Sequence, residues 1–277
     1  MTPATPSSLP SPATPCAERE RLALALARQA GDLALGYFKQ LAQTDIEVKL
    51  NGQDVVSVAD RAVERFLREE LARHFPADSL LGEEYGLEAG SSGYAWVIDP
   101  IDGTSCFVHG LDTWCVSIAL EHQGQTVAGV VHAPCAGETF HASLGGGAFL
   151  DGSRIAVDGT QSLQQGLTGL GINLRVPPSV ATQFLGRLLE AGGMPYRNGS
   201  GALMLAYVAA GRLIAYHEAH INAWDCLAGL LLIREAGGWT ADFPGAGRDL
   251  LDGGPVSAGA PQVREPLLAL VGNAQPR

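Results

Sequence analysis

The sequence is poor in positive charge and in aromatic residues, and it contains no long hydrophobic run. The 18 Lys and Arg residues are outnumbered by 29 Asp and Glu, so the formal net charge is -11, and aromatic residues make up 6% of the chain. A surface that binds nucleic acid needs clustered Lys and Arg, and a membrane-spanning helix needs about 20 consecutive apolar residues. The composition therefore argues against a nucleic-acid partner and against a membrane partner.

Cysteines are few and lack the spacing of a disulfide framework or a zinc site. The five are Cys16, Cys106, Cys115, Cys135 and Cys226. Their odd number, their wide separation and the lack of any Cys-x-x-Cys pair favour reduced thiols in a cytoplasmic protein. Residues 1–15 are rich in Pro, Ser, Thr and Ala, without the basic start and apolar middle of a secretory signal. We therefore expect a disordered tail at 1–15 and a cytoplasmic location.

Length and composition describe a globular protein with room for one large or two modest domains. The chain has 277 residues, of which 46% are hydrophobic and 17% are charged. Polar residues gather at 159–165, and we place a domain boundary there. We expect an N-terminal α+β domain at 16–160 that carries the metal-site motifs. A C-terminal α/β domain at 161–277 would contribute Asp225 and substrate specificity.

Hydrophobic periodicity divides the chain into segregated helices and strands. In the first half, the pattern predicts helices at 16–40 and 61–74 and strands at 79–81, 95–98, 114–121, 126–133, 139–142, 148–150 and 154–157, the last five as an antiparallel meander. In the second half, it predicts strands at 167–172, 195–197 and 213–217 and helices at 179–191, 202–210 and 224–236. Because strands and helices do not alternate strictly, we predict a layered α+β protein.

Two aspartates flank the expected end of the strand at 95–98. Pro100 has no N–H group for the next ladder bond, so we expect it to end the strand and to leave Asp99 at the carboxyl end. Asp102 and the main-chain carbonyl of Ile101 follow directly. Two carboxylates and one backbone oxygen that converge in this way suit a hard cation.

The residues after these aspartates indicate an anion site beside the cation. Gly103 and Thr104 favour a tight turn whose N–H groups point outward if a short helix follows. A phosphate group bound there would lie next to the cation. The alternative for the whole stretch is a plain strand-to-turn transition in which Asp is the turn former.

Further acidic residues fall at the ends of other expected elements. Asp60 lies near the start of the second helix, where an N-cap is the alternative role. Glu83 and Glu84 follow a short strand, where solvated loop acids are the alternative. Asp225 lies in the first turn of an expected helix, where the helix dipole alone would favour an acid. Each position therefore has a structural explanation as well as a functional one.

Carboxylates collected at element ends suit divalent cations of the magnesium type, which prefer oxygen ligands and keep positions for water and phosphate oxygens. Two or more such ions polarise a phosphoryl group and lower the pKa of a bound water. Thr104, hydrogen-bonded to a carboxylate, would orient that water. No Ser or Cys nucleophile with a positioned His is evident, so the sequence favours hydrolysis of a phosphate ester by direct attack of water.

Three ordered motifs resemble the inositol monophosphatase family of magnesium-dependent, lithium-sensitive phosphatases. They are Gly82-Glu83-Glu84, Asp99-Pro100-Ile101-Asp102-Gly103-Thr104 and Trp224-Asp225-x-x-Ala228-Gly229. The resemblance runs from residue 16 to residue 272. It implies the layered αβαβα sandwich of the inositol monophosphatase and fructose bisphosphatase type, two or three bound Mg²⁺ ions, and a homodimer.

The resemblance also implies the metal ligands. Glu83, Asp99 and the Ile101 carbonyl would bind the first ion. Asp99, Asp102 and Asp225 would bind the second. A third, weaker ion would share Glu83.

The resemblance further implies the groups that act on water and phosphate. Asp60 and Thr104 match the pair that helps to activate water, and Glu83 is expected among the catalytic residues with them. The amides of Gly103 and Thr104 match the phosphate-binding turn. Lys49 matches a lysine near the site in family members.

The implied substrate contacts come from the second half of the chain. Glu218 matches a position that hydrogen-bonds a substrate hydroxyl, with an exposed acid at a strand end as the alternative. Ser200 and Ala202, in the turn at 199–202, match the segment that lines the same pocket. Asp225 is expected to contact substrate as well as metal.

One position departs from the family pattern. Members usually read Asp-Gly-Thr-x-Asn-Phe, whereas here Cys106 precedes Phe107. A thiol is a weak hydrogen-bonding group, so it braces a turn less well than an amide does. Because every metal-ligand position is intact, we expect activity together with altered stability of this loop.

The expected substrate is a small phosphorylated polyol or a related metabolite, with inositol 1-phosphate as the family default. Histidinol phosphate, a 3'-phosphonucleotide and fructose 1,6-bisphosphate stay open, because the superfamily keeps the metal core and varies the pocket. No basic cluster is evident around Glu218, which argues against doubly phosphorylated substrates. A different class of function is a regulatory or binding protein that retains the metal site, since some bacterial relatives act partly through the transcription machinery.

Overall fold

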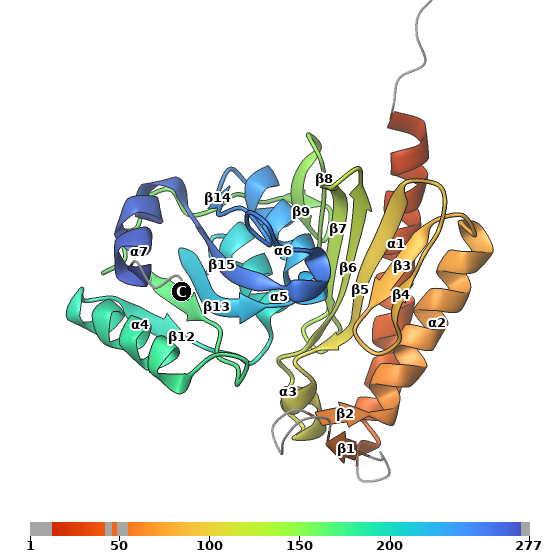
Figure 1. The fold of residues 1–277 in the computed structure, drawn as a ribbon, viewed down its shortest axis with the longest axis horizontal. Helices are drawn as coiled ribbons and strands as arrows, with labels where there is room; N and C mark the ends of the chain where they lie inside the picture. Colours follow the sequence, from red (N-terminus) through yellow and green to blue (C-terminus); the bar gives the residue numbers. More distant parts are fainter. Residues whose placement is uncertain (1–12, 42–45, 49–54, 273–277) are drawn as a thin grey trace, which may run out of the picture.

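The computed structural model describes residues 13–41, 46–48 and 55–272, which form five layers (Figure 1). Helices α1 (Ala13–Phe38) and α2 (Val58–His74) cover the outer face of a large sheet. Helices α5 (Gly201–Ala209) and α6 (Ala223–Glu235) lie between this sheet and a smaller one. Helices α4 (Pro178–Glu190) and α7 (Arg264–Val271) cover the far side of the smaller sheet. The layered α+β sandwich predicted from the sequence is therefore confirmed.

The larger sheet has the strand order β10-β9-β8-β7-β6-β5-β3-β4. Its strands are β3 (Ser79–Gly82), β4 (Gly86–Glu88), β5 (Tyr94–Asp102), β6 (Cys115–His122), β7 (Gln125–Ala133), β8 (Glu138–Ser143), β9 (Gly147–Leu150) and β10 (Ser153–Arg154). Strands β3 and β5 are parallel, and the run from β5 to β10 is antiparallel, of which β6 to β10 are the predicted meander. A short helix, α3 (Thr104–Val108), follows β5, and β1 (Ile46–Val48) pairs with β2 (Val55–Ser57) apart from this sheet.

The smaller sheet has the strand order β12-β11-β13-β15-β14. Its strands are β11 (Leu167–Leu170), β12 (Met194–Tyr196), β13 (Ala215–Ile221), β14 (Trp239–Thr240) and β15 (Gly254–Gly259). Strand β11 is parallel to both of its neighbours, β12 and β13. The carboxyl ends of these three strands therefore lie at the same edge of the sheet.

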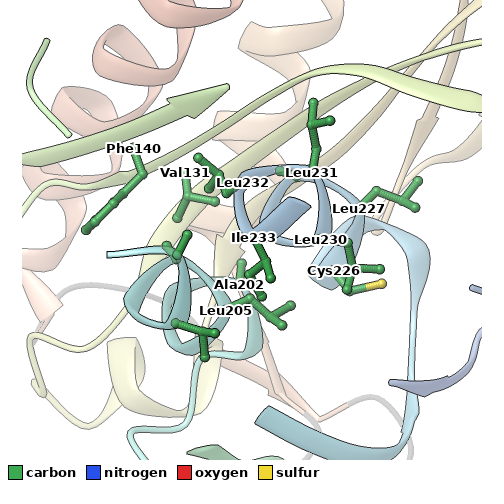
Figure 2. Packing of buried hydrophobic residues seen from close by; sticks show 14 of the residues in the cluster. Val131, Phe140, Ala202, Leu205, Cys226, Leu227, Leu230, Leu231, Leu232 and Ile233 are labelled. Atoms are coloured by element: carbon green, nitrogen blue, oxygen red, sulfur yellow. The ribbon is translucent and has the colours of Figure 1, made fainter. Parts of the chain in front are cut away.

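The middle helical layer is apolar on all sides. Helix α6 buries the consecutive residues Leu230, Leu231, Leu232 and Ile233, which point to all sides of the helix, as in a helix enclosed between two layers. Figure 2 shows these side chains packed near residues of α5 and of the larger sheet. Gly129 of β7 allows the close approach, because a Cβ atom there would lie 2.9 Å from the Cα atom of Ala228. Strands β6 and β7 are consequently buried on both faces, between α1 and α6.

Several element boundaries differ from the predictions. Helix α1 begins at Ala13, inside the expected tail, and residues 1–12 lie outside the described part of the chain. The strand expected at 154–157 ends at Arg154. Strand β13 continues through Glu218 to Ile221, so Glu218 lies within a strand and not at its end.

Strands β14 and β15 and helix α7 were not predicted. The sequence of β15 is Gly-Pro-Val-Ser-Ala-Gly, which has the composition of a loop. It forms a strand because β13 and β14 pair with it on its two sides. Among the described residues, no helix is both long enough and apolar enough to cross a membrane.

Candidate active site

Three acidic side chains meet where β3, β5 and α6 approach one another. Glu83 directly follows β3, Asp99 lies in β5, and Asp225 lies in the first turn of α6. One carboxylate oxygen of each residue lies within 4.8 Å of those of the other two. The fold thus brings together one acid from each of the three sequence motifs. We call Glu83, Asp99 and Asp225 the acid cluster.

An irregularity in β5 accommodates Pro100 inside the strand. Asp99 pairs with Ser117 of β6, and Asp102 pairs with Cys115, so three steps along β5 match two steps along β6. The extra residue is a β-bulge, which bends the strand and tolerates a residue without an N–H group. The prediction that Pro100 ends the strand is therefore wrong. The bulge separates the two aspartates, and Asp102 lines a cavity that adjoins the cluster.

The acids of this site repel one another. Burial raises the pKa of Asp99 well above its usual range, and the negative charges of Glu83, Asp225 and Asp102 raise it further. Burial also raises the pKa of Asp225 well above its usual range, with Asp102 and Glu83 adding to the effect. Such a set of oxygen donors with excess negative charge is suited to a divalent cation, which would offset the repulsion. The residues present therefore fit Mg²⁺.

Asp102 connects the site to the N-terminus of α5. Its Oδ2 accepts hydrogen bonds from the Ser200 hydroxyl at 2.5 Å and from the Ala202 N–H at 2.7 Å. Burial raises the pKa of Asp102 to about 7, against the lowering effect of these two bonds. Ser200 and Ala202 are fully buried, while Gly199 and Gly201 line the adjoining cavity. Contact of Ser200 and Ala202 with substrate stays a prediction, and in this structure they support Asp102.

The turn after β5 has the conformation that the sequence predicts. Gly103 has φ 98°, in the left-handed region that favours glycine, and it caps the expected short helix α3. The Thr104 hydroxyl lies 3.1 Å from Asp60 Oδ1 and 3.1 Å from the Ile101 carbonyl oxygen, so it donates to one of them at a time. Asp60 is the third residue of α2 and is fully buried. The structure therefore unites the expected water-activating pair.

A cavity of about 150 Å³ adjoins the acid cluster and is lined by residues of both halves of the chain. Its lining includes Asp102 and Asp225 together with Tyr216, Glu218 and Asn173. Glu218 is 8% exposed, and its carboxylate accepts hydrogen bonds from the Tyr216 hydroxyl at 2.5 Å and from Asn173 Nδ2 at 2.8 Å. The alternative of an exposed strand-end acid is therefore wrong, and contact of Glu218 with substrate stays a prediction.

Two arginines at this cavity were missed by sequence reasoning. Arg175 lies shortly after β11, Arg197 directly follows β12, and both line the cavity that holds Glu218. Because β11 and β12 are parallel neighbours, the segments that follow them leave the sheet at the same edge. The inference that no basic cluster lies around Glu218 is wrong for this reason. The available signal was their position, Arg175 shortly after the strand expected at 167–172 and Arg197 at the end of the one expected at 195–197.

A buried acid behind the cluster was also missed. Glu64 of α2 is fully buried, forms an ion pair with Arg68 at 2.8 Å, and accepts the N–H of Glu84 at 2.7 Å. It also accepts the N–H of the next residue at 3.1 Å. Glu64 thereby holds the turn that carries Glu83. Its spacing of one helical turn from Asp60 was the signal that could have revealed it.

Two other expectations concern residues near this site. Lys49 lies outside the described residues. Cys106, at the usual Asn position, is buried, and its thiol donates a hydrogen bond to the Asn198 carbonyl at 3.1 Å. The Thr113 hydroxyl donates to the same oxygen at 2.8 Å. These bonds tie α3 to the loop that precedes α5, so the thiol bridges the two halves of the site.

Two features define the class of this protein. It is a five-layered αβαβα protein, and it has a cluster of carboxylates where β3, β5 and α6 approach one another. The model of the Inositol monophosphatase family matches residues 17–275, and the chain belongs to this family of metal-dependent phosphatases. An "Inositol-1-monophosphatase" of Mesorhizobium japonicum is 42% identical over 82% of this chain and 86% of its own length.

Two further relatives carry a different name. A "Nus factor SuhB" of Pseudomonas aeruginosa is 37% identical over 90% of this chain and 94% of its own length. The crystal structure of the extragenic suppressor protein suhB from Bartonella henselae superposes with a TM-score of 0.87 at 32% identity, and covers 93% of this chain and 100% of that one. Fold and family therefore agree, while the names of the relatives differ.

Proposed function

We propose that this chain is a magnesium-dependent phosphomonoesterase that releases phosphate from a small phosphorylated metabolite by direct attack of water. The observation that carries the proposal is the approach of Glu83, Asp99 and Asp225 oxygens to within 4.8 Å in a member of a phosphatase family. Two or three Mg²⁺ ions, when bound, would polarise the phosphoryl group and lower the pKa of a bound water.

Each proposed ligand is a residue already located in the site. Glu83, Asp99 and the Ile101 carbonyl are proposed for one ion. Asp99, Asp102 and Asp225 are proposed for a second, and a third would share Glu83. These residues come from three separate segments of the chain, so metal binding requires that both halves be docked.

The chain's own groups orient the water and hold the phosphate. When the Thr104 hydroxyl donates to Asp60, its oxygen lone pairs are free to accept a hydrogen bond from the attacking water. Asp60 can then take up the proton that the water loses, through Thr104. The N–H groups of Gly103 and Thr104, at the start of α3, would bind the phosphate oxygens. The family resemblance adds inhibition by lithium and a homodimer to the proposal, and the cysteine pattern adds a cytoplasmic location.

Inositol 1-phosphate is the first proposed substrate, because Glu218 offers an acceptor to hydroxyl groups. Arg175 and Arg197 favour a second candidate, a sugar or polyol that carries a second phosphate, such as fructose 1,6-bisphosphate. The same two positive charges disfavour histidinol phosphate, whose alcohol part carries a cationic amine. A 3'-phosphonucleotide would bring an additional anionic group to the arginines and stays open.

The test is phosphate release from these four compounds with magnesium and with chelator. Release that depends on magnesium supports the proposal, and the relative kcat/KM values rank the substrates. A preference for fructose 1,6-bisphosphate that disappears in Arg175→Gln would support the second candidate. Folded protein that is stabilised by magnesium yet releases no phosphate from any of the four would contradict the proposal.

A regulatory or binding protein that retains the metal site is the alternative, because the relative from Pseudomonas aeruginosa is named a Nus factor. It predicts that magnesium raises the thermal midpoint without turnover. Phosphate release by the same preparation separates the two functions. That the protein has no nucleic-acid partner stays a prediction from its net charge.

A further inference from the structure

The carboxamide of Asn173 joins three groups at the wall of the cavity. Its Nδ2 donates to Glu218 Oε1 at 2.8 Å and to the His220 carbonyl oxygen at 2.5 Å. Its Oδ1 accepts a hydrogen bond from the backbone N–H of Arg175 at 2.8 Å. Both partners of the nitrogen can only accept and the partner of the oxygen can only donate, so the orientation of the carboxamide is settled by its surroundings.

Tyr216 donates a hydrogen bond to the other carboxylate oxygen of Glu218. Its hydroxyl is fully buried and donates to Glu218 Oε2 at 2.5 Å. Each carboxylate oxygen of Glu218 therefore accepts one hydrogen bond from the protein and keeps a further lone pair. Because Glu218 lines the cavity, we expect these remaining lone pairs to be the acceptors for the alcohol part of a substrate.

Two glycines fix the position of this carboxylate. A Cβ atom at Gly171 would lie 2.1 Å from Glu218 Oε2 and 2.5 Å from the Tyr216 hydroxyl oxygen. A Cβ atom at Gly201 would lie 3.2 Å from the same hydroxyl oxygen. Since neither position has a side chain, the carboxylate and the hydroxyl lie directly against the backbone, and a Cβ atom at Gly171 would displace both.

The same carboxamide also controls the rim of the cavity. Because Asn173 accepts the Arg175 N–H, it fixes the backbone at the point from which the Arg175 side chain leaves. Arg175 and Arg197 lie close enough to Glu218 to lower its pKa, in opposition to the larger effect of burial. One side chain thus places both a negative acceptor and a positive donor around the substrate.

We propose that Asn173 is a positioning residue that determines specificity, holding Glu218 and Arg175 so that the site selects phosphomonoesters by the hydroxyl groups of their alcohol part. The inference rests on the proposed phosphatase function and concerns the alcohol side of the same site. Asn173 does not touch the acid cluster, so its loss should alter which ester is bound and leave the attack on phosphorus intact.

The test compares two substrates in three variants. Inositol 1-phosphate has hydroxyl groups for Glu218, and phenyl phosphate has none. Asn173→Asp keeps the shape of the side chain and replaces the two donated bonds by repulsion from Glu218. Tyr216→Phe removes the other donor. Gln164→Glu is the matched control, because the Gln164 carboxamide also donates to a carbonyl, that of Ala191 at 3.0 Å, away from the cavity.

We expect Asn173→Asp to raise KM for inositol 1-phosphate about 10- to 100-fold with kcat changed by less than about threefold, because uniform binding is lost. Tyr216→Phe should raise the same KM by about fivefold to tenfold, since one donor of two is removed. Phenyl phosphate should be hydrolysed with unchanged kcat/KM by both variants, and the control should match the unaltered protein with both substrates.

Two results would overturn the inference. Equal losses with both substrates would assign Asn173 a merely structural role, and no loss with either would assign it none. If Asn173→Asp does not fold, Asn173→Ser answers the same question without the added charge. Failure of the unaltered protein on phenyl phosphate and on all four of the proposed substrates is a different outcome, which contradicts the phosphatase proposal itself and this inference with it.

Discussion

The acid cluster and Glu218 are two ways of burying carboxylates beside one cavity, which Asp225 and Glu218 both line. Burial raises the pKa of Asp99 and of Glu218 alike. The neighbours of Asp99 are acids that raise its pKa further, whereas hydrogen bonds from Tyr216 and Asn173 act against burial at Glu218. Glu218, which receives hydrogen bonds from protein donors, is therefore suited to act as a hydrogen-bond acceptor of fixed orientation. Asp99, which lies beside other acids, is suited to bind a cation that offsets their repulsion.

The strongest test of this comparison is Asp99→Asn. Loss of one charge from the cluster should lower magnesium-dependent phosphate release by about 1,000-fold or more. At a magnesium concentration of about 100 times Kd, the unaltered protein should gain about 2.7 kcal/mol, or about 5 to 10 °C in Tm. The variant should lose this gain. Its Tm in chelator at pH 8 should exceed that of the unaltered protein, because repulsion within the cluster is relieved.

The control for this variant is Asp32→Asn, which removes one charge from the exposed side of α1. It should keep both the activity and the magnesium-dependent rise in Tm. A full rise in Tm for Asp99→Asn would contradict the view that the cluster depends on a cation.

A second test concerns Glu64, a buried carboxylate with protein donors that supports the acid cluster. Glu64→Gln removes the ion pair with Arg68. It also removes one hydrogen-bond acceptor for the N–H groups of the turn that carries Glu83. We expect about 3 kcal/mol less stability, measured by urea denaturation, and about tenfold weaker magnesium binding, measured by titration calorimetry. Glu70→Gln, on an outer ion pair of the same helix, should change stability by less than about 0.5 kcal/mol. Unchanged magnesium affinity in Glu64→Gln would separate Glu64 from the metal site.

A third test extends the comparison to a buried base. His217 adjoins Glu218 in β13, and burial lowers its pKa from 6.5 to about 4. Because this pKa is lower in the folded than in the unfolded state, the unfolded state binds more protons between pH 6.5 and 4. The free energy of unfolding should therefore fall as the pH drops through this window, by about 2 kcal/mol at pH 5 for this group.

The measurement for His217 is urea denaturation at pH 7 and pH 5 in chelator, for the unaltered protein and for His217→Asn. The Asn amide can replace the bond from Nδ1 to the Val256 carbonyl. The change in stability between the two pH values should differ between the proteins by about 2 kcal/mol. An equal change in both would show that His217 is protonated in the folded state.

The smallest effect on stability and turnover is expected at Cys106, which joins α3 to the loop before α5. A Cβ atom at Gly199 would lie 2.4 Å from the Cys106 sulfur, so the thiol fills its space. Cys106→Asn should cost about 1 to 2 kcal/mol by crowding and change turnover by less than about threefold. Cys106→Ser, which keeps the donor to Asn198, should cost less. Equal melting temperatures for all three proteins would make the departure from the family pattern inconsequential.

The acids of the acid cluster could be singled out in the sequence because they lie near expected element ends and in three motifs that resemble a known family. Asp99, Asp102 and Asp225 needed no knowledge of pairing. The prediction that Pro100 ends its strand was wrong, because the pairing with the partner strand decides whether a strand ends or forms a bulge. Arg175 and Arg197 could not be joined from sequence, since their proximity follows from the parallel pairing of β11 with β12.

The fold showed the same division. The layered architecture followed from segregated helices and strands, which are local patterns. Strand β15 did not, because its small residues take an extended form only between two partners. Glu64 was missed because a buried acid on an amphipathic helix looks in the sequence like one on the solvent side. Its three partners, Arg68 and two backbone N–H groups, become visible only in the folded chain.

The enclosure of β6 and β7 between α1 and α6 has a consequence for the growing chain on the ribosome. Helix α1 is made before these strands, but α6 is made long after them. Until α6 arrives, one apolar face of the sheet is open to other nascent chains, a state that favours aggregation. Because α6 also carries Asp225, the helix that closes this face is the one that completes the acid cluster. A chain that can bind metal is therefore one in which α6 already covers the face of the sheet that favours aggregation.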